Sequence, residues 1–474
     1  MELLTPSSSF MGTCSHDVFL RSSPSSAARS SHGILRIPLQ LFCSLDAASG
    51  SCSSSSSSTR ASSHNLQKRQ ALQGAEAIVS PELSRLTNNI PTDAKTNIGS
   101  VEHHPKNDYK PPPPQLGNPL NFYLPPLNCS TPPKLHPLYH PARETCDSWL
   151  ISTLKPRNEA YKQFLIQSMH PLFVSLTIPD GLTSRILPIC KLIAWLFVVD
   201  NFSDELLLMS DDLMSEKEYY EVILSLLEGK PFSSSKEWNV ELKELSDVLL
   251  DVWADIKSSM SERQQRRFIN IIKDIFDATL TQSQKRDEQG IVDLDTYLSF
   301  RKYTGEGYMF MILAEYGSGL DLDEDVLTHP DIVKLQEMVA YHVSYVNDLL
   351  SFRKEFCLGH HQSLPSILCV HEGYNMQESI FRVCRMIQGL DDEYVSLKKK
   401  VTMNKELVGR EGVREYLDVL GYVMSGFLEW AYQTGRYHGL NNHLSLRSGL
   451  VSLVHLDLTL ITQGVVKSEL FADN

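Results

Sequence analysis

Apolar residues recur at intervals of three and four along most of the chain after about residue 146, and this period predicts α-helices. The longest periodic stretches predict helices at 240–256, 331–356, 377–401 and 413–432. No stretch has the apolar–polar alternation of a β-strand, and no internal repeat is present. The pattern therefore predicts one large all-α domain.

Capping sequences predict where two further helices begin. Ser215 is followed three residues later by Glu218, which is the pattern of a capping box, and we expect this helix to run to Gly229. Ser261 and Gln264 have the same spacing and open a second helix.

Composition divides the 474 residues into two parts. Residues 1–115 are rich in Ser and Pro, include the run Ser53–Ser58 and contain few acids, so they cannot bury enough apolar surface to fold alone. We expect a disordered extension there, with an organelle-targeting segment in residues 1–60 as the alternative. The folded domain is predicted at 116–470, and the Pro-rich stretch 111–133 is expected to wrap over it in an extended conformation.

Charge and cysteine content exclude several classes of protein. The net charge of −13 argues against a nucleic-acid partner and suits a protein that gathers divalent cations. No apolar run is long enough to form a transmembrane segment. The nine cysteines form no C-x-x-C pair and no zinc-site spacing, so reduced thiols and a cytoplasmic location are expected.

The most informative motif is the segment 347–355. Asn347, Ser351 and Glu355 are spaced by four residues, so a helix would align an amide oxygen, a hydroxyl and a carboxylate on one face. Mg²⁺ prefers such all-oxygen ligands. The alternative is a polar stripe on a surface helix, but the preceding segment 339–346 is largely apolar, which favours an interior position.

A second acidic site follows the apolar run 192–199. Phe197, Asp200 and Asp204 share one helical face, and Glu205 comes next. The alternative is a helix that simply leaves the core at its charged end. If this face met the 347–355 motif, the two together would hold several divalent ions, which in turn would hold a diphosphate.

Two basic elements match such a site. Arg301 lies 46 residues before Asn347 and is followed by Gly305 and Gly307, which predict a helix break or a close backbone approach. The pair at 436–437, Arg and Tyr, donates well to phosphate oxygens.

These four elements, in this order and at these spacings, resemble the microbial, fungal-type class I terpene cyclases. The family pattern consists of an aspartate-rich motif, an Arg about 46 residues before an N-D-x-x-S-x-x-x-E motif, and a late R-Y pair. The resemblance covers roughly residues 120–465, including the opening segment 122–126. It implies a class I terpenoid synthase helical bundle with a central apolar cavity.

The resemblance also implies roles for individual residues. The metal ligands would be Asp200, assisted by Asp204 or Glu205, together with Asn347, Ser351 and Glu355. The diphosphate would be bound by Arg301, Lys354, Arg436 and Tyr437. Arg301 would also act as the diphosphate sensor, with Thr304 and Gly305 at the helix break. Phe197 and Trp430 would form aromatic walls of the cavity, with ordinary core packing as the alternative.

One position departs from the family pattern, because Asn201 occupies the place of the usual second Asp of the first motif. Activity is expected to survive, since many members of the family bind metal through the first Asp alone, although the affinity for Mg²⁺ is expected to be lower.

The function that the resemblance implies is a lyase reaction. Three Mg²⁺ ions and basic side chains would draw the diphosphate off a linear isoprenyl diphosphate, farnesyl diphosphate first, and the carbocation would cyclise to a sesquiterpene. The alternatives are a degenerate cyclase that only binds a prenyl diphosphate and a chain-elongating prenyltransferase. The expected partner is the small-molecule substrate, and the protein would be a monomer or a homodimer.

Overall fold

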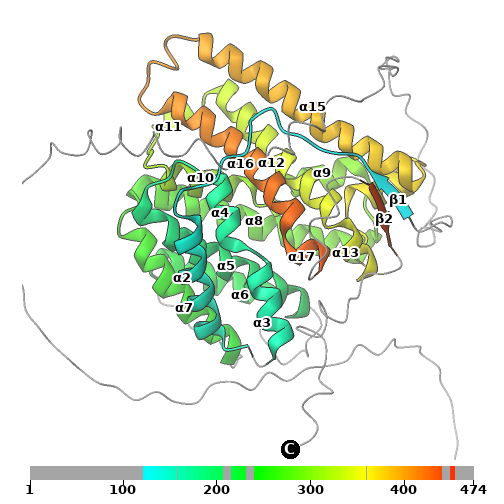
Figure 1. Cartoon of the computed structure of the whole chain (residues 1–474), viewed down its shortest axis with the longest axis horizontal. Helices are drawn as coiled ribbons and strands as arrows, with labels where there is room; N and C mark the ends of the chain where they lie inside the picture. The colour runs from blue at the N-terminus through cyan, green and yellow to red at the C-terminus, as the bar shows by residue number, and fades with distance from the viewer. Residues whose placement is uncertain are drawn as a thin grey trace, which may run out of the picture. The chain divides into compact units, whose positions relative to one another are not determined.

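A computed structural model describes residues 121–156, 158–206, 215–230, 240–358, 360–439 and 449–453, without the side chains of 201–206 and 240–242 (Figure 1). The predicted extension at 1–115 lies outside the described residues. The earlier helices are α2 (Tyr139–Leu154), α3 (Glu159–Gln167), α4 (His170–Thr177), α5 (Thr183–Leu206), α6 (Glu216–Glu228), α7 (Val240–Lys257), α8 (Glu262–Gln289) and α9 (Leu294–Thr304). They are followed by α10 (Gly307–Gly317), α11 (Glu324–Leu327), α12 (Pro330–Leu350), α13 (Phe352–Cys357), α14 (Leu364–His371), α15 (Met376–Met403), α16 (Val413–Gln433) and α17 (Gly435–His438).

The helix starts predicted from capping sequences are confirmed. Ser215 and Glu218 form a reciprocal capping box at the start of α6, and Gly229 ends that helix in the left-handed conformation. At α8, the Ser261 side chain accepts a hydrogen bond from the backbone N–H of Gln264.

The predicted helix at 331–356 is divided at Ser351 into α12 and α13. The Ser351 hydroxyl lies 2.6 Å from the carbonyl oxygen of Asn347, one turn earlier. Such bonding back to the preceding turn tends to bend a helix. The backbone of Ser351 nevertheless stays right-handed helical, with φ −83° and ψ −13°, so α13 continues the course of α12.

Helix α12 lies at the centre of the bundle, where it packs against α9, α10, α15 and α16. The long α15 runs alongside it, and α16 packs against both α12 and α4 (Figure 1). Thirteen of the 21 residues of α12 are buried. None of the described helices has the combination of length and apolar composition that crossing a membrane requires.

The helical pattern did not predict a short antiparallel ribbon formed by β1 (Asn121–Leu124) and β2 (Gly449–Ser452). After β1 the chain continues without helix as far as α2. It is held to the bundle because the backbone N–H of Leu127 donates to the Tyr432 hydroxyl at 3.0 Å and that of Ser130 donates to Asp391 at 2.8 Å. For residues 121–133, the expected extended segment over the folded domain is confirmed.

Candidate functional site

The predicted row of oxygen atoms on α12 and α13 is confirmed. The backbone N–H of Ser351 donates to the carbonyl of Asn347 at 2.9 Å, and that of Glu355 donates to the carbonyl of Ser351 at 3.1 Å. This four-residue bonding carries the helical spacing across the division at Ser351. The Ser351 hydroxyl, which is fully buried, also lies 2.6 Å from a carboxylate oxygen of Glu355.

Arg301 reaches this row from α9. Its Nη2 donates to the amide oxygen of Asn347 at 2.6 Å, and its Nε donates to the Asp348 carboxylate at 3.0 Å. Burial is the largest single effect and lowers the pKa of the guanidinium. The nearby groups Asp348, Tyr297 and Glu355 together outweigh it, so the pKa is raised above its usual range. Arg301 therefore remains a cation inside the bundle.

Asp348 is a site residue that the sequence analysis missed. Its side chain is 1% exposed, and its second oxygen accepts hydrogen bonds from the Tyr297 hydroxyl at 2.7 Å and the backbone N–H of Leu364 at 3.1 Å. Burial raises the pKa of this carboxyl, while Arg301 opposes that shift. The sequence did contain a signal for Asp348, because it is an aspartate with apolar neighbours in a predicted helix. A carboxylate buried in such a place needs a partner.

The Arg–Tyr pair on α17 connects the row on α12 to the acidic end of α5. The Tyr437 hydroxyl accepts a hydrogen bond from the Asn347 amide at 2.6 Å, and Arg436 forms an ion pair with Asp200. Arg436 is 6% exposed and Asp200 is 54% exposed, so Asp200 faces solvent at one side of the pair. The structure thus brings together the two predicted acidic sites.

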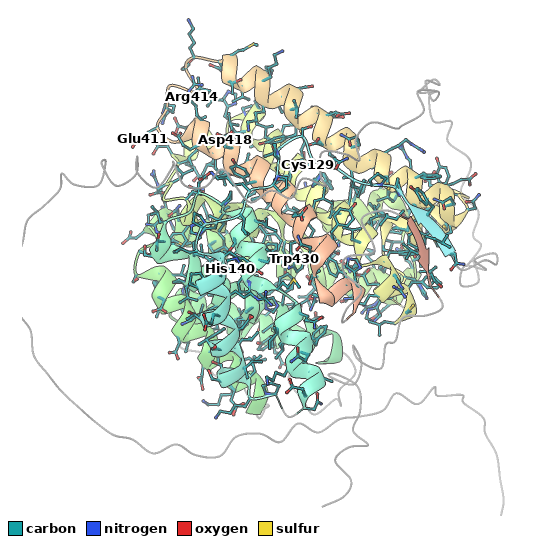
Figure 2. The ribbon with its side chains drawn as sticks, in the orientation of Figure 1. Cys129, His140, Glu411, Arg414, Asp418 and Trp430 are labelled. Atoms are coloured by element: carbon teal, nitrogen blue, oxygen red, sulfur yellow. The ribbon has the colours of Figure 1, made fainter. Side chains whose placement is uncertain are left out.

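Phe197 and Trp430 pack against each other beneath the ion pair. Their rings are stacked at 5.4 Å between centroids, and the Arg436 guanidinium lies 5.0 Å from the centre of the Phe197 ring. Trp430, labelled on α16 in Figure 2, is fully buried and donates to the carbonyl of Ser168 at 3.0 Å. Phe173, Phe310 and Phe427 extend this aromatic cluster, so the two predicted residues belong to a larger apolar group adjoining the site.

The predicted helix break is confirmed between α9 and α10. A Cβ atom on Gly305 would overlap the Ser344 hydroxyl, and one on Gly307 would lie 2.7 Å from the Cα of Ala340. Both glycines therefore permit a close approach to α12. Glu306 lies between them with φ +60°, in the left-handed region.

Three predicted site residues are less fully defined. Asp204 and Glu205 belong to α5, but their side chains lie outside the described part of the chain. Lys354 lies on α13 next to Glu355 and is half-buried.

The donor atoms suit a hard cation. Within the described residues, no group of three or more His, Cys, Asp or Glu side chains could hold a metal ion. The candidate ligands are instead an amide, a hydroxyl and carboxylates, and these oxygen donors fit Mg²⁺ better than a softer metal.

Comparisons with known proteins point to one family. The family described as terpene synthase family 2, C-terminal metal binding, matches residues 191–390. The (E)-2-epi-beta-caryophyllene synthase of Selaginella moellendorffii is 29% identical over 342 residues, which cover 70% of this chain and 89% of the relative. Sesquiterpene synthase Agr1 of Cyclocybe aegerita is 25% identical over 283 residues, covering 60% and 78%.

The fold is shared with solved structures as well. A variant of cucumene synthase superposes with a TM-score of 0.55 at 23% identity, covering 65% of this chain and 99% of that one. The family match and the relatives support a class I terpene cyclase, an enzyme of the lyase class, and the solved structures share its fold.

Proposed function

We propose that this cyclase ionises farnesyl diphosphate in a Mg²⁺-dependent reaction, cyclises the allylic cation to a sesquiterpene and releases diphosphate. Two sets of polar contacts, brought together by the adjacent residues 436 and 437, carry the proposal: Arg436 pairs with Asp200, and Asn347 bonds both Tyr437 and Arg301. The C15 substrate is chosen because the Cyclocybe relative is named a sesquiterpene synthase.

Asn347, Ser351 and Glu355 would hold Mg²⁺ from one side, and Asp200, with Asp204 or Glu205, from the other. Bound Mg²⁺ would neutralise the charge that develops on the leaving diphosphate. In the structure these oxygens accept hydrogen bonds or ion pairs from Arg301, Ser351 and Arg436. On substrate binding, Arg301 and Arg436 would therefore exchange these protein acceptors for diphosphate oxygens.

Arg301 would bind the diphosphate with the part of its guanidinium that Asp348 leaves uncovered. Its Nη1 has only a long contact of 3.4 Å, to the Thr304 hydroxyl, among the described residues. Arg436 and Lys354 would add positive charge, and Tyr437 a hydroxyl donor. Such preorganised donors are worth most where negative charge develops in a site shielded from water.

The aromatic cluster would receive the isoprenoid chain. Phe197 and Trp430 stack on each other next to the ion pair, and aromatic quadrupoles stabilise cations by about 0.5–2 kcal/mol per contact. An apolar surrounding would also exclude the water that captures carbocations.

The test is incubation of the full chain with C10, C15 and C20 diphosphates, followed by gas chromatography of the volatile products. We expect products from the C15 substrate with Mg²⁺ and none after chelation of the metal. Asn347→Ala and Glu355→Ala should abolish turnover, whereas Glu337→Ala should not, because Glu337 is an acidic residue of α12 that pairs with Lys302.

A second readout keeps the metal assignment separate from catalysis. Calorimetric titration of the protein with Mg²⁺ in the presence of inorganic pyrophosphate should show binding to the wild type and weaker binding to Asn347→Ala. Binding without turnover of any of the three substrates would instead support the degenerate, binding-only alternative. The oligomeric state, monomer or homodimer, and the cytoplasmic location stay predictions from the sequence.

A further inference from the structure

The ribbon formed by β1 and β2 has a buried inner face. Phe122 and Leu124 of β1 are buried, whereas the residues that alternate with them are exposed. Phe122 pairs across the ribbon with Val451 of β2, which is also buried. The ribbon includes most of the opening segment 122–126, to which the proposed function gives no role.

The inner face of the ribbon lies against the helices that carry the site. One small pocket is lined by Phe122, Leu124 and Val451 of the ribbon, together with Leu349 of α12, Arg353 of α13 and His438 of α17. The same three helices carry the row of oxygen atoms and the Arg–Tyr pair. The ribbon is therefore next to the site, although it contributes no predicted ligand.

Both ends of α13 contact the ribbon. This helix has only six residues, Phe352–Cys357, and it carries Glu355 at the end of the row. Phe352 is fully buried, and its ring centroid lies 5.9 Å from that of Phe122. The Cys357 thiol donates to the carbonyl of Leu453, directly after β2, at 3.0 Å. Because so short a helix is not stable alone, these contacts contribute to holding it in place.

The ribbon is in turn fixed to the long helix α15 (Figure 1). The backbone N–H of Tyr123 donates to Oε1 of Gln377 at 2.7 Å, and Nε2 of Gln377 donates to the carbonyl of Tyr123 at 2.9 Å. Since α15 also packs along α12, the ribbon connects α13 to the central part of the bundle.

The other two elements that pack against α13 give it less support. Helix α17 has only four residues, Gly435–His438. Helix α12 ends at Leu350, so α13 is joined to it through the division at Ser351. A supporting contact from outside these two helices is therefore needed to fix the direction of α13.

We propose that Phe122 is a positioning residue for metal binding, which holds α13 through Phe352 so that Glu355 stays one turn beyond Ser351. A metal site requires its ligands to be held within about 0.5 Å of their working positions. A loosened α13 should therefore weaken Mg²⁺ binding before it harms the rest of the fold. The inference rests on the proposed function and extends it by giving the opening segment a part in the metal site.

The test is calorimetric titration with Mg²⁺ in the presence of inorganic pyrophosphate. Phe122→Ala should bind Mg²⁺ about tenfold more weakly than the wild type, as expected when a contact that supports a metal ligand is lost. In steady-state kinetics, the Mg²⁺ concentration that gives half the maximal rate should rise by a similar factor. The value of kcat at saturating Mg²⁺ should fall by less than about threefold. Phe122→Leu, which keeps the apolar bulk, should recover most of the affinity.

Phe268→Ala is the matched control, because Phe268 of α8 is similarly buried and stacks on Trp253 of α7. This variant should lose stability without a change in Mg²⁺ affinity. Hydrogen exchange of the metal-free protein gives a readout that needs no ligand. Peptides that span residues 351–358 should exchange faster in Phe122→Ala and at the wild-type rate in Phe268→Ala.

A milder pair of variants decides the question if Phe122→Ala does not fold. Cys357→Ala removes the thiol bond to Leu453 and should weaken Mg²⁺ binding by about threefold. Cys357→Ser keeps a donor and should stay closer to the wild type.

Unchanged Mg²⁺ affinity in Phe122→Ala, or in Cys357→Ala where the first variant does not fold, would overturn the inference. An equal loss of affinity in Phe268→Ala would overturn it as well. A wild type that binds Mg²⁺ with pyrophosphate but consumes no isoprenyl diphosphate refutes the proposed function alone, because the binding comparison still decides the role of Phe122. A wild type that binds no Mg²⁺ with pyrophosphate refutes both.

Discussion

The pair formed by Arg301 and Asp348 can be compared with a second buried pair, Arg267 of α8 and Glu315 of α10. Arg267 donates to both oxygens of Glu315, at 2.8 and 2.9 Å, and Glu315 is 1% exposed. Arg301 instead places Nε and Nη2 on a single oxygen of Asp348, at 3.0 and 2.8 Å. The two pairs have the same chemistry and similar burial but different geometry.

The two pairs differ in the contacts that the guanidinium and the carboxylate make outside the pair. Glu315 also accepts hydrogen bonds from the backbone N–H of Leu322 at 2.9 Å and from Gln264 at 3.3 Å, so this pair joins α8 to α10 and to the segment that follows it. Arg301 turns its remaining donors to Asn347 and Thr304 in the site. A buried arginine becomes a candidate substrate ligand when its carboxylate covers only one edge of it.

The largest expected effect comes from neutralising each carboxylate. Asp348→Asn and Glu315→Gln each leave a buried arginine without its counter-charge, which should lower the free energy of unfolding by about 3–5 kcal/mol. Turnover per folded molecule should fall by about 10²–10³ in Asp348→Asn only, because Arg301 loses its position. Denaturant unfolding would measure the loss of stability, and steady-state kinetics on the same samples would measure the loss of turnover. Equal losses of turnover in the two variants would contradict the proposed difference between the pairs.

Replacing each arginine by lysine should produce a smaller difference in kcat between the two pairs. Lysine keeps the charge but cannot form the planar fork, so Arg301→Lys should reduce kcat by about 10–100-fold through poorer diphosphate contacts. Arg267→Lys should reduce stability without changing kcat. A normal kcat in Arg301→Lys would show that only the charge at this position matters.

A substitution at the helix break, where α9 and α12 approach closely, should perturb the Arg301–Asp348 pair more weakly. Gly305→Ala places a methyl group against the Ser344 hydroxyl, and the overpacking should cost about 1–3 kcal/mol of unfolding free energy and displace α9 from α12. Gly229→Ala is a useful contrast, because its Cβ meets no other atom within 4 Å and only the left-handed φ of +70° is strained. Kinetic impairment in Gly229→Ala as large as in Gly305→Ala would argue against a local effect at the break.

The smallest effect should follow removal of one hydrogen bond from Asp348. Tyr297→Phe deletes the hydroxyl that donates to the carboxylate at 2.7 Å, and about 1–2 kcal/mol of unfolding free energy should be lost. Because Arg301 and the backbone N–H of Leu364 still hold Asp348, kcat should change less than about fivefold. A loss of turnover comparable to that of Asp348→Asn would assign Tyr297 a direct part in the site.

Sequence patterns predicted the helices, the row on α12 and the break at Gly305 because each depends on local spacing. They did not predict that Asp348 anchors Arg301, since this contact joins residues 47 positions apart and depends on how α9 packs against α12. The sequence also offered no sign of β1 and β2, whose four residues each are too short to show alternation.

The β1–β2 ribbon has a consequence for how the domain folds. Residues 121–124 meet residues 449–452 across more than 300 positions of chain, and closing so long a loop carries a large entropic cost that neighbouring contacts must offset. The ribbon should therefore form only after the helices between its strands have assembled. A spectroscopic reporter at Tyr123 would then register the final step of folding, after the signals of helix formation are complete.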